Sequence, residues 1–162
     1  MKSLIQLKVN GDLFEIAVAS NRTLLEALRY ECHLTGSKQG CDMGDCGACT
    51  VLIDGVPIQA CITLAMDCVG KDIVTVEGIA KHNEPHPVQI AWNNQGASQC
   101  GYCTPGFMVV AKWLFDRNPD PTEEEIKTAL SGNICRCTGY TKIICAMKEA
   151  IEIMNDKQSA MK

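Results

Sequence analysis

The stretch KQGCDMGDCGACTVLIDGVPIQAC, residues Lys38–Cys61, decides how this chain is organised. Three of its cysteines, Cys41, Cys46 and Cys49, have C-x4-C-x2-C spacing, and Cys61 follows after eleven further residues. Glycines stand among the first three cysteines, at Gly40, Gly44 and Gly47. Because glycine lacks a Cβ, it tolerates positive φ and lets backbone N–H groups approach sulfur closely. The stretch therefore predicts a tightly turning loop that brings several thiols together.

The spacing of the first three cysteines is that of plant-type [2Fe–2S] proteins, in which four thiolates hold a two-iron cluster. Structural zinc also takes four thiolates, but it usually binds two short C-x2–4-C knuckles. Here three candidate ligands share one loop, whereas Cys61 comes alone after an apolar strand, Thr50–Ile53, and a turn at Asp54-Gly55. We therefore expect these four cysteines to hold a [2Fe–2S] cluster, with zinc as the alternative.

Composition excludes several classes of function. The net charge of the 162 residues is −4 with no basic run, so nothing indicates nucleic acid or an anionic membrane surface as a partner. No apolar run reaches the length of a transmembrane helix. The N-terminal MKSLIQLKVNGD alternates like a strand and does not resemble a secretory signal. With 11 cysteines and no export signal, we expect metal or redox chemistry in the cytoplasm and not a disulfide framework.

The first half of the chain indicates a small α+β domain. Alternating residues predict strands over residues 5–9 and 13–18, joined by a hairpin turn at Asn10-Gly11. Thr23 and Glu26 form a capping box that predicts a short helix to about Tyr30. A closing strand is expected over Asp72–Glu77. Together these elements predict a sheet with one helix packed across it.

The second half indicates a small four-helix bundle. The boundary is expected near Gly78, which gives domains at 1–78 and 79–162, with the polar segment Lys81–Pro87 as the linker. We expect helices at 88–94, 107–115, 122–130 and 140–154, the third opened by a capping box. Prolines disfavour a helix that would align His82 with His86, so both histidines are expected to be solvated linker residues.

A second group of cysteines lies at the turns of this bundle. Cys100 and Cys103 form C-x2-C before one helix, and Cys135 and Cys137 form C-x-C before the last helix. The two pairs can meet only if two helix N-termini converge, and such termini favour thiolates and a negatively charged cluster. Arg136 between the last pair adds positive charge or serves as a surface ion-pair partner. On chemistry alone zinc remains open for this group.

The remaining cysteines have simpler interpretations. Cys32 and Cys68 are expected to be buried free thiols that pack like small hydrophobic residues. Cys145 lies inside the last predicted helix and is expected in the core, as are Met147 and Met154. His33, just past the first helix, is expected at the surface.

Taken in this order, the two cysteine groups resemble the small iron–sulfur subunit of the molybdenum hydroxylase family, which includes xanthine dehydrogenase, aldehyde oxidoreductase and 4-hydroxybenzoyl-CoA reductase. The matching stretches are GSKQGCDMGDCGACTVLIDG, QCGYCTPG and GNICRCTGY. The resemblance implies a plant-type ferredoxin-like (β-grasp) domain followed by a four-helix [2Fe–2S] domain. It implies two [2Fe–2S] clusters, one held by Cys41, Cys46, Cys49 and Cys61, the other by Cys100, Cys103, Cys135 and Cys137.

The resemblance also implies partners. The second cluster would lie nearer the molybdopterin cofactor of a large subunit, with Gln99 contacting that cofactor and Cys137 close to it. An ordinary capping role for Gln99 remains open. The first cluster would pass electrons to FAD on a medium subunit, within a heterotrimer or a dimer of heterotrimers. The chain would then conduct single electrons between two two-electron centres and carry no catalytic residue of its own. The alternatives are a free-standing ferredoxin-like carrier and a zinc-stabilised interaction module.

Overall fold

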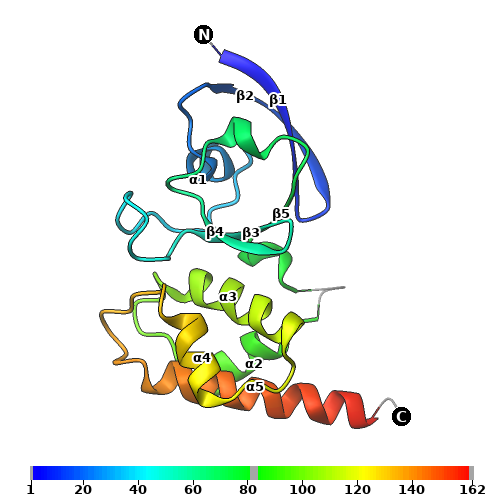
Figure 1. The fold of residues 1–162 in the computed structure, drawn as a ribbon, viewed down its shortest axis with the longest axis vertical. Coiled ribbons are helices and arrows are strands. Elements are labelled where there is room, and N and C mark those ends of the chain that lie inside the picture. Colours follow the sequence, from blue (N-terminus) through cyan, green and yellow to red (C-terminus); the bar gives the residue numbers. More distant parts are fainter. Residues whose placement is uncertain (1, 81–83, 161–162) are drawn as a thin grey trace.

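The computed structural model describes residues 2–80 and 84–160, and the expectation for His82 lies outside these residues. The described chain forms two parts stacked along its longest axis (Figure 1). A sheet with a short helical segment forms the N-terminal part, and the helices of the second half form the other. The domain limits 1–78 and 79–162 stay a prediction.

Within the described residues, five strands form one mixed sheet in the order β2-β1-β5-β3-β4. Their bounds are Lys2–Val9 (β1), Asp12–Ala19 (β2), Thr50–Ile53 (β3), Val56–Gln59 (β4) and Asp72–Val74 (β5). β1 runs parallel to β5, and the other neighbouring pairs are antiparallel. The strands β3 and β4 lie at the end of the sheet that faces the helices (Figure 1).

The two predicted hairpin turns are present. Asn10 and Gly11 have φ of 55° and 92°, and Asp54 and Gly55 have φ of 50° and 76°. Positive φ at both central residues fits the right-handed twist of the flanking strands, and it explains why Asn-Gly and Asp-Gly occur there. The second turn returns the chain along β3 and so carries it toward Cys61.

The predicted helix across the sheet begins at Leu24, and its capping box is confirmed. Thr23 accepts from the amide of Glu26 at 3.2 Å, and the Glu26 carboxylate accepts from the amide of Thr23 at 3.0 Å. Beyond α1 (Leu24–Glu26) the chain widens into a π-turn, η1 (Ala27–Glu31). The amide of Cys32 donates to the carbonyl of Ala27, a wider closure than helix periodicity predicts.

The closing strand, expected over Asp72–Glu77, is shorter in the structure. It ends at Val74, and η2 (Ala65–Cys68) precedes it while η3 (Val76–Gly78), another 3₁₀ turn, follows it. The amide of Thr75 donates to Oδ1 of Asn10 at 2.9 Å, and the hydroxyl of Thr75 donates to Glu77. These side-chain bonds take the place of strand pairing after β5.

The predicted helices of the second half are present, with α2 and α4 close to their expected bounds and α3 and α5 longer than expected. They are α2 (Pro87–Asn94), α3 (Thr104–Arg117), α4 (Glu123–Leu130) and α5 (Thr141–Ala160). The expectation that His86 is a solvated linker residue is wrong. Its Nδ1 accepts from the amide of Val88 at 3.2 Å and caps α2, with Pro87 at the first helical position.

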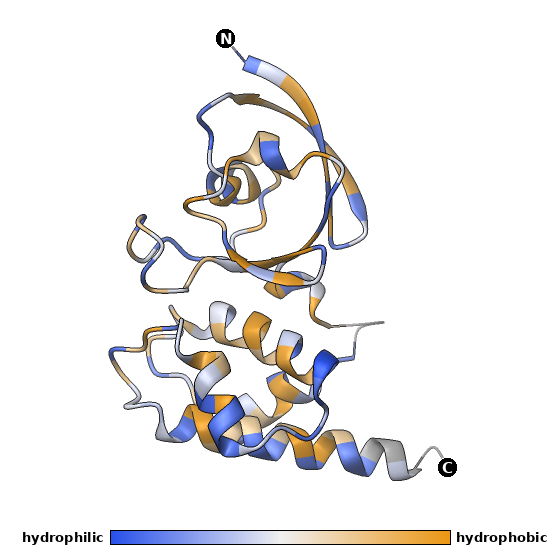
Figure 2. Ribbon diagram, viewed as in Figure 1, coloured by the Kyte–Doolittle hydropathy of each residue, from blue (hydrophilic) through white to orange (hydrophobic). Residues whose placement is uncertain are grey.

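Each part has its own apolar core, and a small third cluster joins them. Leu52, Ile79 and Val109 are buried between the parts, packed against partly buried residues that include Val76 and Trp113. Figure 2 shows hydrophobic residues along the strands and along α3, which faces the sheet. The two parts therefore pack directly on one another.

The expectation that Cys145 belongs to the core is wrong, because its side chain is exposed. Ile143, Met147 and Ala150 of α5 are completely buried, and Cys145 lies on the opposite side of the helix. Met147 is in the core as expected, and Met154 packs against the core as a partly buried residue.

Candidate metal centres

The four cysteines of the first set converge at one end of the sheet. Cys41 and Cys46 lie in the irregular loop before β3, Cys49 immediately precedes β3, and Cys61 follows β4. Because β3 and β4 pair directly, they bring Cys49 and Cys61 together from opposite strands. The thiol of Cys49 interacts with that of Cys61, and Cys46 interacts with Cys41 and Cys61.

The loop directs backbone N–H groups at the first thiol. The amides of Asp45 and Cys46 donate to Sγ of Cys41 at 3.3 and 3.4 Å. These bonds, with the amide of Met43 as the largest cause, lower the pKa of Cys41 to about 7. Donors aimed at sulfur stabilise a thiolate, and in iron–sulfur proteins such bonds tune the potential of the bound cluster.

Two glycines of the loop have distinct roles. Gly44 adopts φ of 82°, a conformation that the expected tight turn requires. At Gly40 the reason is proximity, because a Cβ there would stand 2.7 Å from Sγ of Cys46. The loop can therefore fold around its own thiols only with glycine at position 40.

The second set converges where two helices begin. Cys103 is the residue before α3, and Cys135 and Cys137 lie in the turn before α5. Sγ of Cys137 lies 3.6 Å from Sγ of Cys100, and Cys103 interacts with Cys135. The predicted meeting of the two pairs is therefore present. Cys100 and Cys137 are exposed, whereas Cys135 is buried.

The GNICRCTGY turn supports Cys135 from both sides. The hydroxyl of Thr138 lies 3.0 Å from Sγ of Cys135, and the Thr138 amide donates to the same sulfur at 3.5 Å. The amide of Cys135 donates to the hydroxyl of Tyr140 at 3.0 Å. Burial, the largest single cause, raises the pKa of Cys135, but hydrogen bonds from Thr138, Cys137 and Cys103 together outweigh it, so the pKa is lowered.

Burial and neighbouring thiols oppose ionisation of some cysteines in each set. Burial, with the neighbouring thiols adding to it, raises the pKa of Cys49 and of Cys103 to about 12. The neighbouring Cys100 thiol is the largest cause of the raised pKa of Cys137. A metal centre removes this repulsion, because its positive charge stabilises several thiolates at once. The cysteines are all free thiols within the described chain. Their role as ligands of two iron–sulfur centres stays a prediction.

A contact between the two loops was not foreseen from the sequence. The amide of Ile134 donates to the carbonyl oxygen of Cys46 at 2.9 Å, and the side chain of Asn133 donates to the carbonyl of Gly47 at 3.0 Å. The segment before Cys135 thus lies directly against the loop that holds Cys46. No local sequence pattern predicts these contacts, because the bond from Asn133 to Gly47 joins residues 86 apart in sequence.

Other candidate residues fall at the surface or in the core. Gln99 is exposed beside Cys100, and Arg136 is exposed between Cys135 and Cys137. Cys32 and Cys68 are buried free thiols, as predicted, with exposed fractions of 6% and 0%. His33 is exposed, also as predicted.

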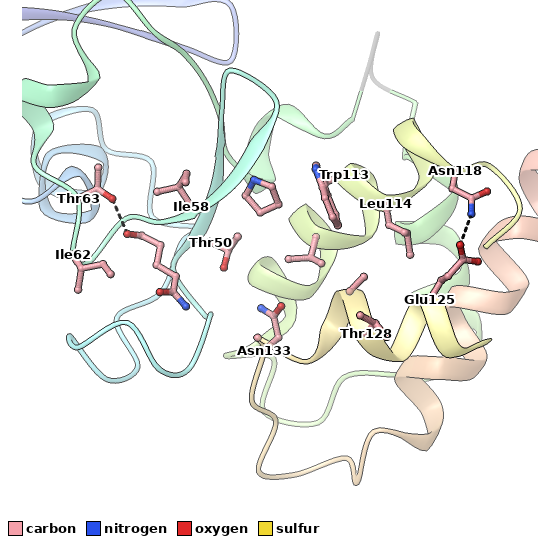
Figure 3. Close-up of a pocket in the computed structure, with 15 residues that line it drawn as sticks. Thr50, Ile58, Ile62, Thr63, Trp113, Leu114, Asn118, Glu125, Thr128 and Asn133 are labelled. Carbon is pink, nitrogen blue, oxygen red and sulfur yellow. Dashed lines mark hydrogen bonds between the residues drawn. The ribbon is translucent and has the colours of Figure 1, made fainter. Parts of the chain in front are cut away.

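A groove of about 720 Å³ runs between the two parts (Figure 3). Ile58 and Ile62 line it on the sheet side, and Trp113 and Leu114 of α3 line it on the helical side. Its lining contains no cysteine. The groove therefore holds no thiol, although Thr50 and Asn133, which are close in sequence to Cys49 and Cys135, belong to its lining.

Comparison with known proteins gives a consistent result. A family described as "2Fe-2S iron-sulfur cluster binding domain" matches residues 7–71, and one described as "[2Fe-2S] binding domain" matches residues 75–148. The small FeS subunit of nicotinate dehydrogenase from Eubacterium barkeri is 48% identical, covering 93% of this chain and 96% of the relative. One of the subunits of nicotinate dehydrogenase from Pseudomonas putida is 43% identical, covering 94% and 97%.

A solved structure, quinoline 2-oxidoreductase from Pseudomonas putida 86, superimposes with a TM-score of 0.90. It is 38% identical in sequence, and the match covers 96% of this chain and 97% of the matched chain. Both cysteine-bearing parts are therefore present together, in the same arrangement, in a chain of similar length.

Proposed function

This chain belongs to the family of small [2Fe–2S] subunits of molybdenum hydroxylases, and from that premise we propose how its residues perform the work of such a subunit. It is an electron-transfer subunit with two [2Fe–2S] clusters. In the proposal, Cys41, Cys46, Cys49 and Cys61 hold one cluster, and Cys100, Cys103, Cys135 and Cys137 hold the other. When bound, each cluster supplies a centre that accepts and releases one electron.

The observation that carries the proposal is the hydrogen bond from Ile134 to Cys46. Cys46 belongs to the first set, and Ile134 directly precedes Cys135 of the second set. Through the 2.9 Å bond between them, a ligand of one set connects to a ligand of the other by backbone atoms alone. The two sets are therefore neighbours in the fold, which supports a path for electrons between them.

We propose that this chain has no substrate-converting role. The sets are made of thiols held by backbone and hydroxyl donors, and the groove between the parts is mostly apolar. In the proposal the protein holds the clusters, sets their separation and tunes their potentials through N–H···S bonds. In this role no residue of the chain need act as an acid, a base or a nucleophile.

The exposed side of the second set is proposed as the face toward the large molybdopterin-binding subunit. Cys100 and Cys137 are exposed there, and Gln99 lies beside them as a proposed contact to the molybdenum cofactor. The loop of Cys41, with exposed Met43 at its tip, is proposed to face the medium FAD-binding subunit. The proposed assembly is a heterotrimer or a dimer of heterotrimers in the cytoplasm. Among the described residues, no helix is long and apolar enough to cross a membrane.

Metal analysis of the purified complex tests the ligand assignment. We expect about four irons and four acid-labile sulfides per chain, because each [2Fe–2S] cluster has two of each. Cys103→Ser should remove the second cluster's signal in electron paramagnetic resonance (EPR) and keep the first. The matched control is Cys145→Ser, which should keep both signals because Cys145 is exposed on α5 outside both sets.

Three outcomes would contradict the proposal. Zinc without sulfide would indicate an interaction module. Loss of a cluster in Cys145→Ser would mean that the ligands are assigned incorrectly. A chain that purifies alone, without flavin or molybdopterin, would indicate a free-standing carrier.

A further inference from the structure

We propose that Gly47, Thr50, Gly106 and Asn133 form an interdomain joint that fixes the separation of the two cysteine sets. The inference rests on the proposed function, because this separation matters only if electrons pass between the sets. None of these four residues is a proposed ligand. The joint acts only by holding the two parts in place.

The carbonyl oxygen of Gly47 is the centre of the joint. Thr50 donates to it through its amide at 3.1 Å and through its hydroxyl at 2.7 Å. Asn133 donates to it through its side-chain amide at 3.0 Å. Thr50 and Asn133 are 5% and 4% exposed, so water cannot replace a lost donor without cost. Figure 3 shows Thr50 on the side of the sheet and Asn133 on the side of the helices.

Helix α3 approaches the same carbonyl through Gly106. A Cβ at Gly106 would overlap the Gly47 oxygen and stand 2.9 Å from the side-chain nitrogen of Asn133. Gly106 is buried, so the contact cannot be relieved by turning a side chain into solvent. Glycine at this position therefore lets the helix after Cys103 lie against the first loop.

Every segment of the joint is close in sequence to a proposed ligand. Gly47 lies between Cys46 and Cys49, Gly106 comes three residues after Cys103, and Asn133 comes two residues before Cys135. Two cysteines of each set thus flank the joint. Because close-packed interiors transmit a displacement instead of absorbing it, a shift at the joint changes the distance between the sets.

Gly106→Ala in the purified complex with its partner subunits is the first test. The matched control is Gly132→Ala, because a Cβ at Gly132 meets nothing within 4 Å although the residue directly precedes Asn133. One readout is the magnetic interaction between the two reduced clusters in EPR, which depends on their separation. The other is the rate of electron transfer between them after rapid injection of one electron. Gly106→Ala should keep both cluster signals, weaken the interaction and slow the transfer severalfold, while Gly132→Ala matches the unmodified protein.

Asn133→Ala is the second variant. It tests whether the joint fixes the separation of the cysteine sets even if Gly106→Ala does not fold. It removes the donor and adds no atom, so it should weaken the interaction in the same direction. An unchanged interaction and rate, or an equal change in Gly132→Ala, would overturn the joint. Loss of one cluster's own signal would also overturn it, because these residues would then serve cluster assembly. Failure of the proposed function would look different, since the unmodified complex would itself lack two [2Fe–2S] signals.

Discussion

The backbone amide of Ile134 donates a hydrogen bond of 2.9 Å to the backbone carbonyl of Cys46. The side chain of Ile134 is 52% exposed and takes no part in this bond. The connection through Ile134 therefore depends on the backbone, which a substitution of the Ile134 side chain leaves in place. A substitution that removes the amide hydrogen therefore tests the backbone bond, and one that changes only the side chain serves as its control.

Ile134→Pro removes that amide hydrogen, and Ile134→Ala is its matched control because alanine keeps it. We expect the proline variant to slow reduction of the flavin in a single turnover, since the backbone link between the loops is lost, although the Asn133 bond to Gly47 remains. It should also lower the free energy of unfolding by about 1 kcal/mol for the lost bond. Stopped-flow absorbance measures the rate. Equal rates in the two variants would show that electrons do not depend on this bond.

Asn10→Ala should destabilise the N-terminal part. Asn10 adopts φ of 55°, its Oδ1 accepts from the amide of Thr75 at 2.9 Å, and its Nδ2 donates to the hydroxyl of Thr75 at 3.0 Å. Loss of two hydrogen bonds and the cost of alanine at positive φ give a loss of about 2–3 kcal/mol. A lower urea midpoint in the purified complex would measure it.

The matched control is Asn10→Asp, which keeps the oxygen acceptor and tolerates positive φ. We expect it to lose about 1 kcal/mol, for the missing donor alone. If Asn10→Ala and Asn10→Asp had the same midpoint, the turn conformation and the acceptor would contribute nothing.

The local features of the fold could be predicted from the sequence because they depend on neighbouring residues. The turns at Asn10-Gly11 and Asp54-Gly55 and the capping box of Thr23 each involve residues within a few positions. The convergence of Cys100 with Cys137 was also predictable, since both precede helices of one bundle. The ligand roles of the cysteines remain a prediction from their spacing and their resemblance to the family.

Other features could not be predicted, because they depend on tertiary contacts. The strand expected to continue to Glu77 ends at Val74 because Thr75 bonds to Asn10, 65 residues earlier. Cys145 is exposed because the buried face of α5 contains Ile143 and Met147, and Cys145 lies on the opposite side of the helix. The joint at Gly47 requires the two parts to be placed against each other first.

Removal of iron should loosen the first loop more than the sheet. Residues 39–48 contain no helix or strand, whereas β1 and β2 are paired along their full length. Without a metal to bridge the thiols, the loop keeps only a few hydrogen bonds, such as that from Ile134 to Cys46. Hydrogen–deuterium exchange after anaerobic chelation should therefore rise at 39–48 and stay low in β1. Equal exchange with and without iron would mean that the loop is ordered by the protein alone.

The buried thiol of Cys32 should make the stability of the protein depend on pH, and it should also react more slowly than an exposed thiol. Cys32 is 6% exposed, and burial raises its pKa from the usual value near 9 to about 11. A raised thiol pKa means that the folded state favours the protonated form. Its contribution to stability is complete below pH 9 and is lost as the pH rises toward 11. The free energy of unfolding should therefore fall over that interval.

Iodoacetamide labelling of the cluster-loaded protein, read by peptide mass spectrometry, tests the difference in reactivity between Cys32 and Cys145. At pH 8 the exposed Cys145 should be labelled while Cys32 stays free, because the thiolate is the reactive form and burial blocks access. Raising the pH to 10 should leave Cys32 largely unlabelled, since its pKa is still higher. Denatured protein is the control in which Cys32 must react. Native labelling of Cys32 as fast as that of Cys145 would show that the segment after η1 opens to solvent, contrary to the place of Cys32 in the packed core.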